Sequence, residues 1–171
     1  MSSRNAEAGD AAVAQLSSFG NVVSIPADLS TEAECRRLAS DVGTREDELH
    51  ILVNNAGATW GEPLQTFPES AWDKLLNLNL KAPFFLTRAF LPLLEEGATD
   101  DDPARVVNVG SIDGLHVPPM HTYSYSSSVA AIIFDSNGPG ATALTVIRRG
   151  PSSLASTRVR WCSAALLEEY E

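Results

Sequence analysis

The segment Ile51–Gly57, with the sequence Ile-Leu-Val-Asn-Asn-Ala-Gly, constrains the fold of this 171-residue chain more than any other. Three apolar residues, two of them β-branched, are typical of a short strand that is buried on both faces. The Asn-Asn-Ala-Gly that follows tolerates positive φ angles and lets a ligand approach the backbone. Open α/β sheets bind ligands at the carboxyl ends of their parallel strands. The segment therefore predicts a strand that leads into a binding loop, with an ordinary strand exit as the alternative.

Strand and helix patterns alternate along the chain, which indicates an α/β fold with parallel strands. Strands are expected over 22–25, 51–53 and 105–109, and helices over 5–19, 31–42 and 68–94. The strands 51–53 and 106–109 are expected to be adjacent and parallel, because a long helix joins them in a right-handed crossover. Pro83 and Pro92 are expected to bend or interrupt that helix. Thr31 and Glu34 fit a capping box at the start of the second helix. The inner face expected for the first helix consists of Ala8, Ala12, Val13, Leu16 and Phe19.

Composition excludes several classes of partner. The formal net charge of −10 argues against nucleic acid or an anionic membrane. No apolar run approaches the length of a membrane span, and no signal-peptide segment is present. Cys35 and Cys162 form neither a disulfide framework nor a zinc set, so a reducing, cytoplasmic setting is expected. The carboxylates of Asp100–Asp102 are interpreted as a solvated charge run rather than a metal site.

Four short motifs then occur in a characteristic order. They are Asn54-Asn55-Ala56-Gly57, Asn77-Leu78-Asn79-Leu80-Lys81, Val107-Asn108-Val109-Gly110-Ser111 and Tyr125-Ser126-Ser127-Ser128. In this order and spacing the chain resembles the short-chain dehydrogenase/reductases. The residues 60–64 and 110–114 most resemble the branch that contains 3-oxoacyl-carrier-protein reductases of the rhamnolipid type. The likeness covers roughly residues 2–128.

The resemblance implies a partial Rossmann-like domain over residues 1–128, a doubly wound parallel sheet. The sequence has no match to the family's first strand and Gly-rich turn, whose amides cradle a pyrophosphate. In the strand order 3-2-1-4-5-6, the strands 22–25 and 51–53 then lack neighbours. The resemblance also implies NADP-dependent hydride transfer to the carbonyl of a small-molecule, 3-oxoacyl-type substrate.

Three catalytic residues are implied by the same resemblance. Ser111 would hydrogen-bond the substrate oxygen, Tyr125 would donate the proton during reduction, and Asn79 would hold a proton-relay water. Hydride transfer leaves negative charge on oxygen, which needs a proton donor and a second hydrogen bond. A free tyrosine, with a pKa of about 10, is a poor proton donor and acceptor at neutral pH. The family supplies a lysine four residues after the tyrosine, whose charge lowers the tyrosine pKa and which also grips the nicotinamide ribose.

The resemblance also implies a set of cofactor-binding residues. The turn residues Asn55, Ala56 and Gly57 would line the cofactor cleft. Asp28 and Leu29 would lie beside the adenine. Ser3 and Arg4 would accept a 2′-phosphate, which favours NADP over NAD, although Arg4 as an idle surface charge is the alternative.

The likeness to the family ends at Val129, which stands where the family has its lysine. Residues 129–171 are expected to be a divergent, poorly ordered tail, with a candidate strand at 142–147 and a helix break at 135–140. A retained intron or frame shift explains this sharp edge, and a simple substitution at Val129 is the alternative. Three hypotheses stay open: a reductase by descent whose chain is an incomplete, inactive fragment; a catalytically dead binding module that forms a homo-oligomer through the 68–94 helix; and a gene-model product without independent function.

Overall fold

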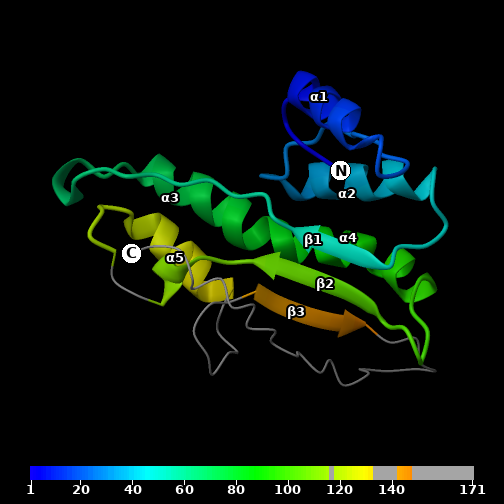
Figure 1. Cartoon of the computed structure of the whole chain (residues 1–171). Coiled ribbons are helices and arrows are strands. Elements are labelled where there is room, and N and C mark those ends of the chain that lie inside the picture. Colours follow the sequence, from blue (N-terminus) through cyan, green and yellow to red (C-terminus); the bar gives the residue numbers. More distant parts are fainter. Residues whose placement is uncertain (116–117, 133–141, 148–171) are drawn as a thin grey trace, which may run out of the picture.

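The computed structural model describes residues 1–115, 118–132 and 142–147 of the chain (Figure 1). Its elements, in chain order, are α1 (Ala6–Leu16), α2 (Glu32–Gly43), β1 (Ile51–Asn54), a 3-10 turn (Leu64–Thr66), α3 (Glu69–Leu75), a π-helical segment (Leu76–Lys81), α4 (Ala82–Glu96), β2 (Ala104–Val109), a second 3-10 turn (Ile112–Gly114), α5 (Tyr123–Ile132) and β3 (Thr142–Ile147).

The three strands form one sheet in the order β1-β2-β3. β1 and β2 are parallel, and their register pairs Leu52 with Val106 and Asn54 with Asn108. This confirms the α/β class and the expected strand pair. β3 is the candidate strand at 142–147, and it runs antiparallel to β2. α5 continues through Val129 to Ile132. The helix break expected at 135–140 and the rest of the tail lie outside the described residues.

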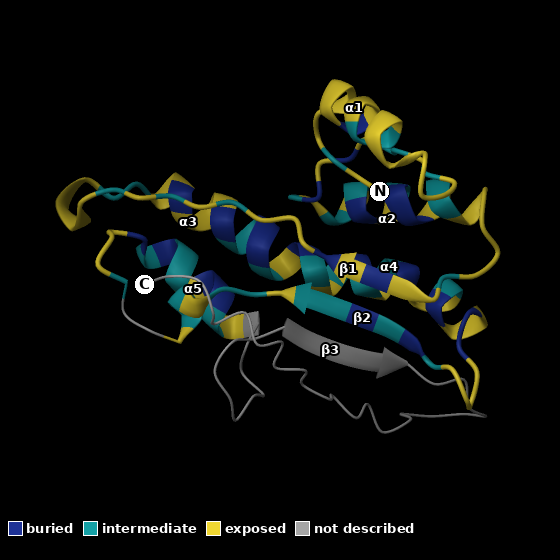
Figure 2. Ribbon diagram, in the orientation of Figure 1, coloured by how far each residue is buried: buried dark blue, intermediate teal, exposed yellow. Residues whose placement is uncertain are grey.

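The core lies between the β1–β2 pair and the helices behind it. α4 packs against both strands, and α2 packs against α4. Leu52 and Val106 are buried in this layer together with the α4 residues Leu86, Phe90 and Leu94. Figure 2 shows the buried positions along α4 and β2 in dark blue. The helix expected over 68–94 is present as three consecutive segments, α3, the π-helical segment and α4. The region therefore forms the connection between two parallel strands that the apolar pattern predicted.

One half of the capping box expected at the start of α2 is present, while the Glu34 carboxylate, expected to complete it, accepts from Arg37. The Thr31 hydroxyl accepts a hydrogen bond from the Glu34 backbone N–H at 3.3 Å. Three buried residues of α2 lie at helical spacing: Cys35, Leu38 and Ala39. Burial raises the pKa of the Cys35 thiol, and the charges of Glu32 and Glu34 raise it further.

The expected burial of β1 on both faces is wrong. Ile51 and Val53 keep 53% and 54% of their surface exposed, because no described segment covers their side of the strand. The expected strand at 22–25 is also wrong, since this extended segment is not part of the sheet. Its hydrogen bonds join it to the first three residues: the Met1 ammonium donates to the Val23 C=O at 2.7 Å, the Ile25 N–H to the Met1 C=O at 3.0 Å, and the Ala27 N–H to the Ser3 C=O at 3.2 Å. A ladder this short does not make a regular strand.

The first helix is present, but the apolar face expected for it is wrong. α1 ends at Leu16, and both Leu16 and Phe19 are exposed. The buried residue of α1 is Gly9, where an added Cβ would lie 2.3 Å from the Ser24 hydroxyl. α1 therefore approaches the 22–25 segment through a glycine, a contact that does not show in the apolar pattern.

Gly97, which follows α4, is expected to resist substitution. A Cβ at this position would lie 2.5 Å from the carbonyl oxygen of Leu49 and 2.8 Å from its carbon. Backbone atoms cannot move aside as a side chain can, so Gly97→Ala is expected to destabilise the fold by about 1–3 kcal/mol. Gly20→Ala is the matched control, since nothing lies within 4 Å of its added Cβ. Urea unfolding of both variants checks this, and equal midpoints would contradict it.

Candidate active site

A pocket of about 310 Å³ lies at the carboxyl ends of β1 and β2. Its walls come from four parts of the chain: the Asn-Asn-Ala-Gly turn after β1, Asn79 of the π-helical segment, Gly110 after β2, and Tyr125 with Val129 from α5. In Figure 1, α5 lies beyond the arrowhead of β2. The pocket is therefore where an open α/β sheet is expected to bind a ligand.

Asn79 joins two walls of this pocket. Its side-chain oxygen accepts from the Ala58 N–H at 2.9 Å, and its amide nitrogen donates to the Ala58 C=O at 2.9 Å and to the Ser128 hydroxyl at 3.0 Å. Only 4% of Asn79 is exposed. The side chain thus holds the loop after β1 against α5.

The π-helical segment explains how Asn79 is placed. In an α-helix the Asn79 carbonyl would accept from residue 83, but Pro83 has no N–H to donate. The chain instead forms a wider turn, in which the Ala82 N–H bonds to the Asn77 C=O. Such π-bulges are frequent at functional sites. The interruption expected from Pro83 is therefore present, whereas α4 does not end at Pro92 but continues through it to Glu96.

α5 contributes Tyr125, Ser128 and Val129. The Ser128 hydroxyl donates to the Tyr125 C=O at 2.8 Å and accepts from Asn79. Val129 is buried and lines the pocket. No lysine or arginine belongs to the described pocket wall. The walls therefore carry amides and one phenol, but no positively charged side chain.

Ser111 stands apart from the other two catalytic candidates. It follows Gly110 of the pocket wall but does not itself line the pocket. Its hydroxyl accepts from the Asp113 N–H at 3.2 Å and so caps the 3-10 turn that follows. The structure therefore brings Asn79 and Tyr125 together with the turn after β1, and leaves Ser111 beside them.

The candidate cofactor residues fall into two groups. Asn55, Ala56 and Gly57 line the pocket described above, whereas Ser3, Arg4 and Asp28 do not. The N–H of Ser30, 3.1 Å from Asp28, lowers the pKa of that carboxyl, and the nearby charge of Arg4 lowers it further. Leu29 lines a second pocket, of about 540 Å³, whose wall also includes Asn55 and Ala56.

Sequence reasoning assigned no role to two polar residues near the pocket, Asn54 and Ser128. The Asn54 amide donates to Asn108 at 2.8 Å and to the Thr87 hydroxyl at 3.2 Å, so it ties the ends of β1 and β2 to α4. The sequence could have indicated this contact, since Asn54 and Asn108 each follow a short apolar run and so lie at the same end of two adjacent strands. Ser128 had no assigned role, although it lies one turn after Tyr125 and so on the same helical face.

Comparison with known proteins identifies the family. Residues 1–134 match the family model of short chain dehydrogenases. The chain belongs to this family. It is 43% identical over 129 residues to the rhamnolipids biosynthesis 3-oxoacyl-(acyl-carrier-protein) reductase of Pseudomonas aeruginosa, which covers 75% of this chain and 50% of the relative. It is 34% identical over 108 residues to a D-beta-hydroxybutyrate dehydrogenase of Rhizobium meliloti, over 63% of this chain and 40% of the relative.

Solved structures agree with this placement. The Pseudomonas aeruginosa RhlG/NADP active-site complex matches with a TM-score of 0.75 and 42% identity, over 78% of this chain and 52% of the other. A short chain dehydrogenase from Burkholderia cenocepacia in complex with NADP matches with a TM-score of 0.68 and 28% identity, over 78% and 53%. The expected family is confirmed, and the chain spans about half the length of the relatives it matches.

Among the described residues, no helix has the length and apolar character to cross a membrane. Within the same part of the chain, no three histidine, cysteine or carboxylate side chains gather in a way that could hold a metal ion.

Proposed function

We propose that the pocket at the carboxyl ends of β1 and β2 is the site of an NADP-dependent oxidoreductase that reduces the carbonyl of a 3-oxoacyl-type substrate. One observation carries this: Asn79 and Tyr125 meet the Asn55–Gly57 turn in a single pocket of about 310 Å³. The names given to one relative support it: the Pseudomonas aeruginosa protein is named a 3-oxoacyl reductase, and its solved structure is named an NADP active-site complex.

The residues in place fit a nicotinamide cofactor only in part. The turn residues are exposed at the rim, where backbone groups can meet a ligand. The buried Val129, however, offers neither a hydrogen bond nor a charge to a ribose. The sequence also contains no Gly-rich turn that could cradle a pyrophosphate. We therefore propose that the chain as given is an inactive, incomplete form of such an enzyme.

The proposed roles of the chain's own residues follow from their positions. Tyr125 is the proton donor at the pocket wall, and Ser111 is the second hydrogen-bond donor to the substrate oxygen. The Ser111 hydroxyl oxygen accepts from the Asp113 N–H, and its own hydrogen is the group that would be donated to a substrate beside Gly110. The side chain of Asn79 is hydrogen-bonded to Ala58 and Ser128. A proton-relay water held by Asn79 would therefore bind its backbone carbonyl.

Titration with NADP⁺ tests the proposed site. Amide NMR spectra of the chain at millimolar NADP⁺ are expected to shift at Asn55, Ala56, Gly57 and Gly110, because these residues line the pocket. Amides of the exposed 64–66 turn are expected to stay unchanged and serve as the control. Shifts confined to other surfaces, or none at all, would contradict the proposal.

A second candidate function is a dimerisation module built on α4. This helix exposes 63% of Phe84 and 37% of Leu91, and both residues line a groove of about 380 Å³. The Arg88 guanidinium lies 5.9 Å from the centre of the Phe84 ring, which gives the exposed face an aromatic–cation pair. An exposed apolar helix face of this kind is typical of protein contact sites.

Phe84→Glu is expected to convert a dimer of this chain into a monomer, because it places a charge in the apolar face. Leu64→Glu is the matched control, since Leu64 is 66% exposed but belongs to a distant turn. Light scattering after gel filtration gives the mass of each variant. A wild-type chain that is monomeric at high micromolar concentration would rule out the module.

A further inference from the structure

A groove of about 600 Å³ lies between α2 and α4, and it shares no residue with the pocket at the ends of β1 and β2. Its bottom is apolar: Ala39 of α2 is buried, and Ala89 and Leu93 of α4 are half-buried. The charged residues of its lining are Arg36 of α2 and Arg88 of α4, which stand exposed at its edge. Among the described residues, no carboxylate belongs to this lining. The groove therefore combines an apolar bottom with a positively charged edge.

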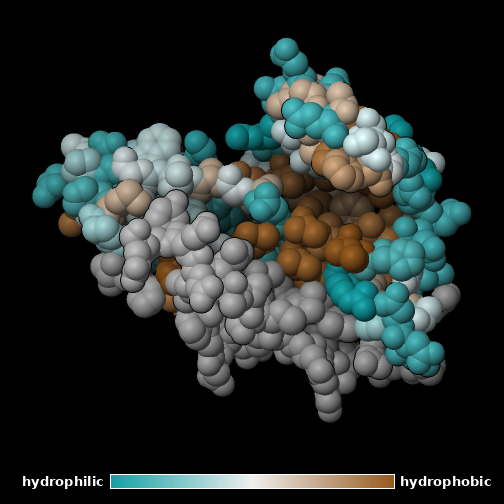
Figure 3. Space-filling model, viewed as in Figure 1, coloured by the Kyte–Doolittle hydropathy of each residue, from teal (hydrophilic) through white to brown (hydrophobic). Residues whose placement is uncertain are grey.

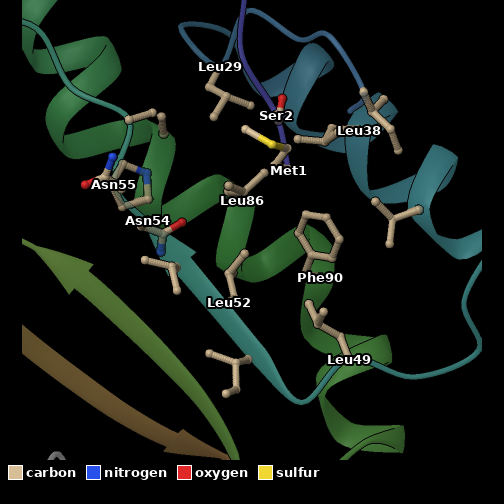
Figure 4. Close-up of a pocket in the computed structure, with 17 residues that line it drawn as sticks. Met1, Ser2, Leu29, Leu38, Leu49, Leu52, Asn54, Asn55, Leu86 and Phe90 are labelled. Atoms are coloured by element: carbon tan, nitrogen blue, oxygen red, sulfur yellow. The ribbon is translucent and has the colours of Figure 1, made fainter. Parts of the chain in front are cut away.

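The same two helices use other residues for the pocket beside β1. Figure 3 shows apolar residues gathered in a hollow on one face of the molecule, and Figure 4 shows the pocket of about 540 Å³ that lies there. Leu38 of α2 and Leu86 and Phe90 of α4 line that pocket. None of these three residues lines the groove, so the groove is a separate feature of this pair of helices.

The edge of the groove carries more positive than negative charge. Arg36 and Arg88 both donate to the same carboxylate oxygen, Oε1 of Glu32. The hydrogen bond from Arg36 lowers the pKa of Glu32, and the charges of both arginines lower it further, so this carboxylate is ionised at neutral pH. Two positive charges thus meet one negative charge. Each guanidinium has five N–H donors, and the bond to Glu32 uses one, so the others can meet a ligand.

Two aromatic rings hold Arg88 in place. Its guanidinium carbon lies 4.9 Å from the centre of the Phe85 ring and 5.9 Å from that of the Phe84 ring. Together with the ion pair to Glu32, these contacts limit the rotamers of a long side chain. Less conformational entropy is then lost when Arg88 binds an anion. The planar guanidinium also matches a carboxylate, with which it can form two parallel hydrogen bonds.

The lining favours an anion with an aliphatic tail over two other occupants. A small anion such as phosphate would pair with the arginines but leave the apolar bottom empty. A peptide strand would find no ladder partner, because the backbone groups of both helices are hydrogen-bonded within each helix. A carboxylate on an aliphatic chain uses both parts, since its head group pairs with guanidinium groups and its tail buries apolar surface. The net charge of −10 repels anions from most of the surface, so the excess positive charge at this edge sets the groove apart.

We propose that the groove between α2 and α4 binds an amphipathic anion, an aliphatic carboxylate. Its head group pairs with Arg36 and Arg88, and its tail packs along Ala39, Ala89 and Leu93. The proposal does not depend on the proposed function, because it needs neither the cofactor nor Tyr125.

The probe is octanoate, titrated into the wild-type chain and followed by amide NMR. Shifts are expected at Ala39, Gly43 and Ala89, which line the groove, and not in the exposed 64–66 turn. Octan-1-ol has the same tail without the charge, and acetate has the same head group without the tail. Both are expected to bind at least about tenfold more weakly, because each loses one of the two contributions. Octanoate shifts confined to other surfaces, or none at all, would contradict the proposal.

Arg36→Gln tests the charged edge, because it removes one guanidinium but keeps a long polar side chain. It is expected to weaken octanoate binding by about tenfold or more, since a hydrogen bond to a charged group is lost. Arg45→Gln is the matched control: it makes the same change of charge just after α2, outside the groove lining, and is expected to bind as the wild type does. Circular dichroism checks that both variants are folded, and the three probes on the wild-type chain give an answer if Arg36→Gln is not.

Three further results would overturn the proposal. The first is binding of octan-1-ol as tight as that of octanoate, which would show that the arginines do not select a charge. The second is an equal loss of octanoate binding in Arg36→Gln and Arg45→Gln, which would make the effect one of overall charge. The third is a wild-type dimer that Arg36→Gln separates into monomers, which would make a second copy of the chain the occupant.

Discussion

The purified chain is expected to oxidise NADPH with a 3-oxoacyl thioester at least on the order of 10²-fold more slowly than an active member of the family. Val129 lines the pocket without a charge or a polar group, so this position offers neither an ammonium group beside the proton donor nor a hydrogen bond to a ribose. The loss of NADPH absorbance measures the rate. Turnover comparable to that of an active relative would contradict our account of the pocket.

Val129→Lys alone is not expected to restore this activity. The sequence still lacks a Gly-rich turn to hold the pyrophosphate, so the cofactor is not seated for hydride transfer. Val129 is only 5% exposed, and a lysine amine there must also be desolvated. Val129→Met, which introduces a side chain of comparable length without a charge, is the control. A large gain of turnover in Val129→Lys and none in Val129→Met would show that the missing charge alone explains the inactivity.

Asn79→Ala is expected to lower the free energy of unfolding by about 2–5 kcal/mol, because three polar groups each lose a hydrogen bond, although the Ser128 hydroxyl keeps its bond to the Tyr125 C=O. These are the N–H and C=O of Ala58 and the hydroxyl of the buried Ser128. Loss of the contact also frees α5 from the loop after β1. Urea unfolding followed by circular dichroism measures the change.

Asn77→Ala is the matched control for this prediction. Asn77 lies in the same π-helical segment, but among the described residues its side chain accepts only from the exposed Lys81 amine. Its replacement is expected to change stability by less than about 0.5 kcal/mol. If both variants lost the same amount of stability, the effect would come from the helix and not from the contacts of Asn79.

Local signals were enough to predict the elements that position the site. The apolar run before Asn54 and the run 106–109 both form strands, and their parallel pairing follows from the helical connection. The Thr31 cap and the interruption at Pro83 are also local, since each depends on groups within one turn. These features need no knowledge of distant parts of the chain.

The features that could not be predicted depend on neighbours far away in the sequence. Ile51 and Val53 have the pattern of a strand buried on both faces, but burial requires a covering segment on each side. Gly9 packs on Ser24 because it has no side chain, which an apolar pattern does not register. The link between Asn79 and Ser128 likewise joins residues 49 positions apart.

Our central claim is that α5 is seated on the π-helical segment, so that Tyr125 shares one pocket with the turn after β1. Nuclear Overhauser contacts between the side-chain amide of Asn79 and the β protons of Ser128 test it most directly, because the two groups are hydrogen-bonded at 3.0 Å. We predict these contacts together with those between Leu52 and Val106 in the sheet. If the sheet contacts were present and those of Asn79 absent, the pocket would not exist as described.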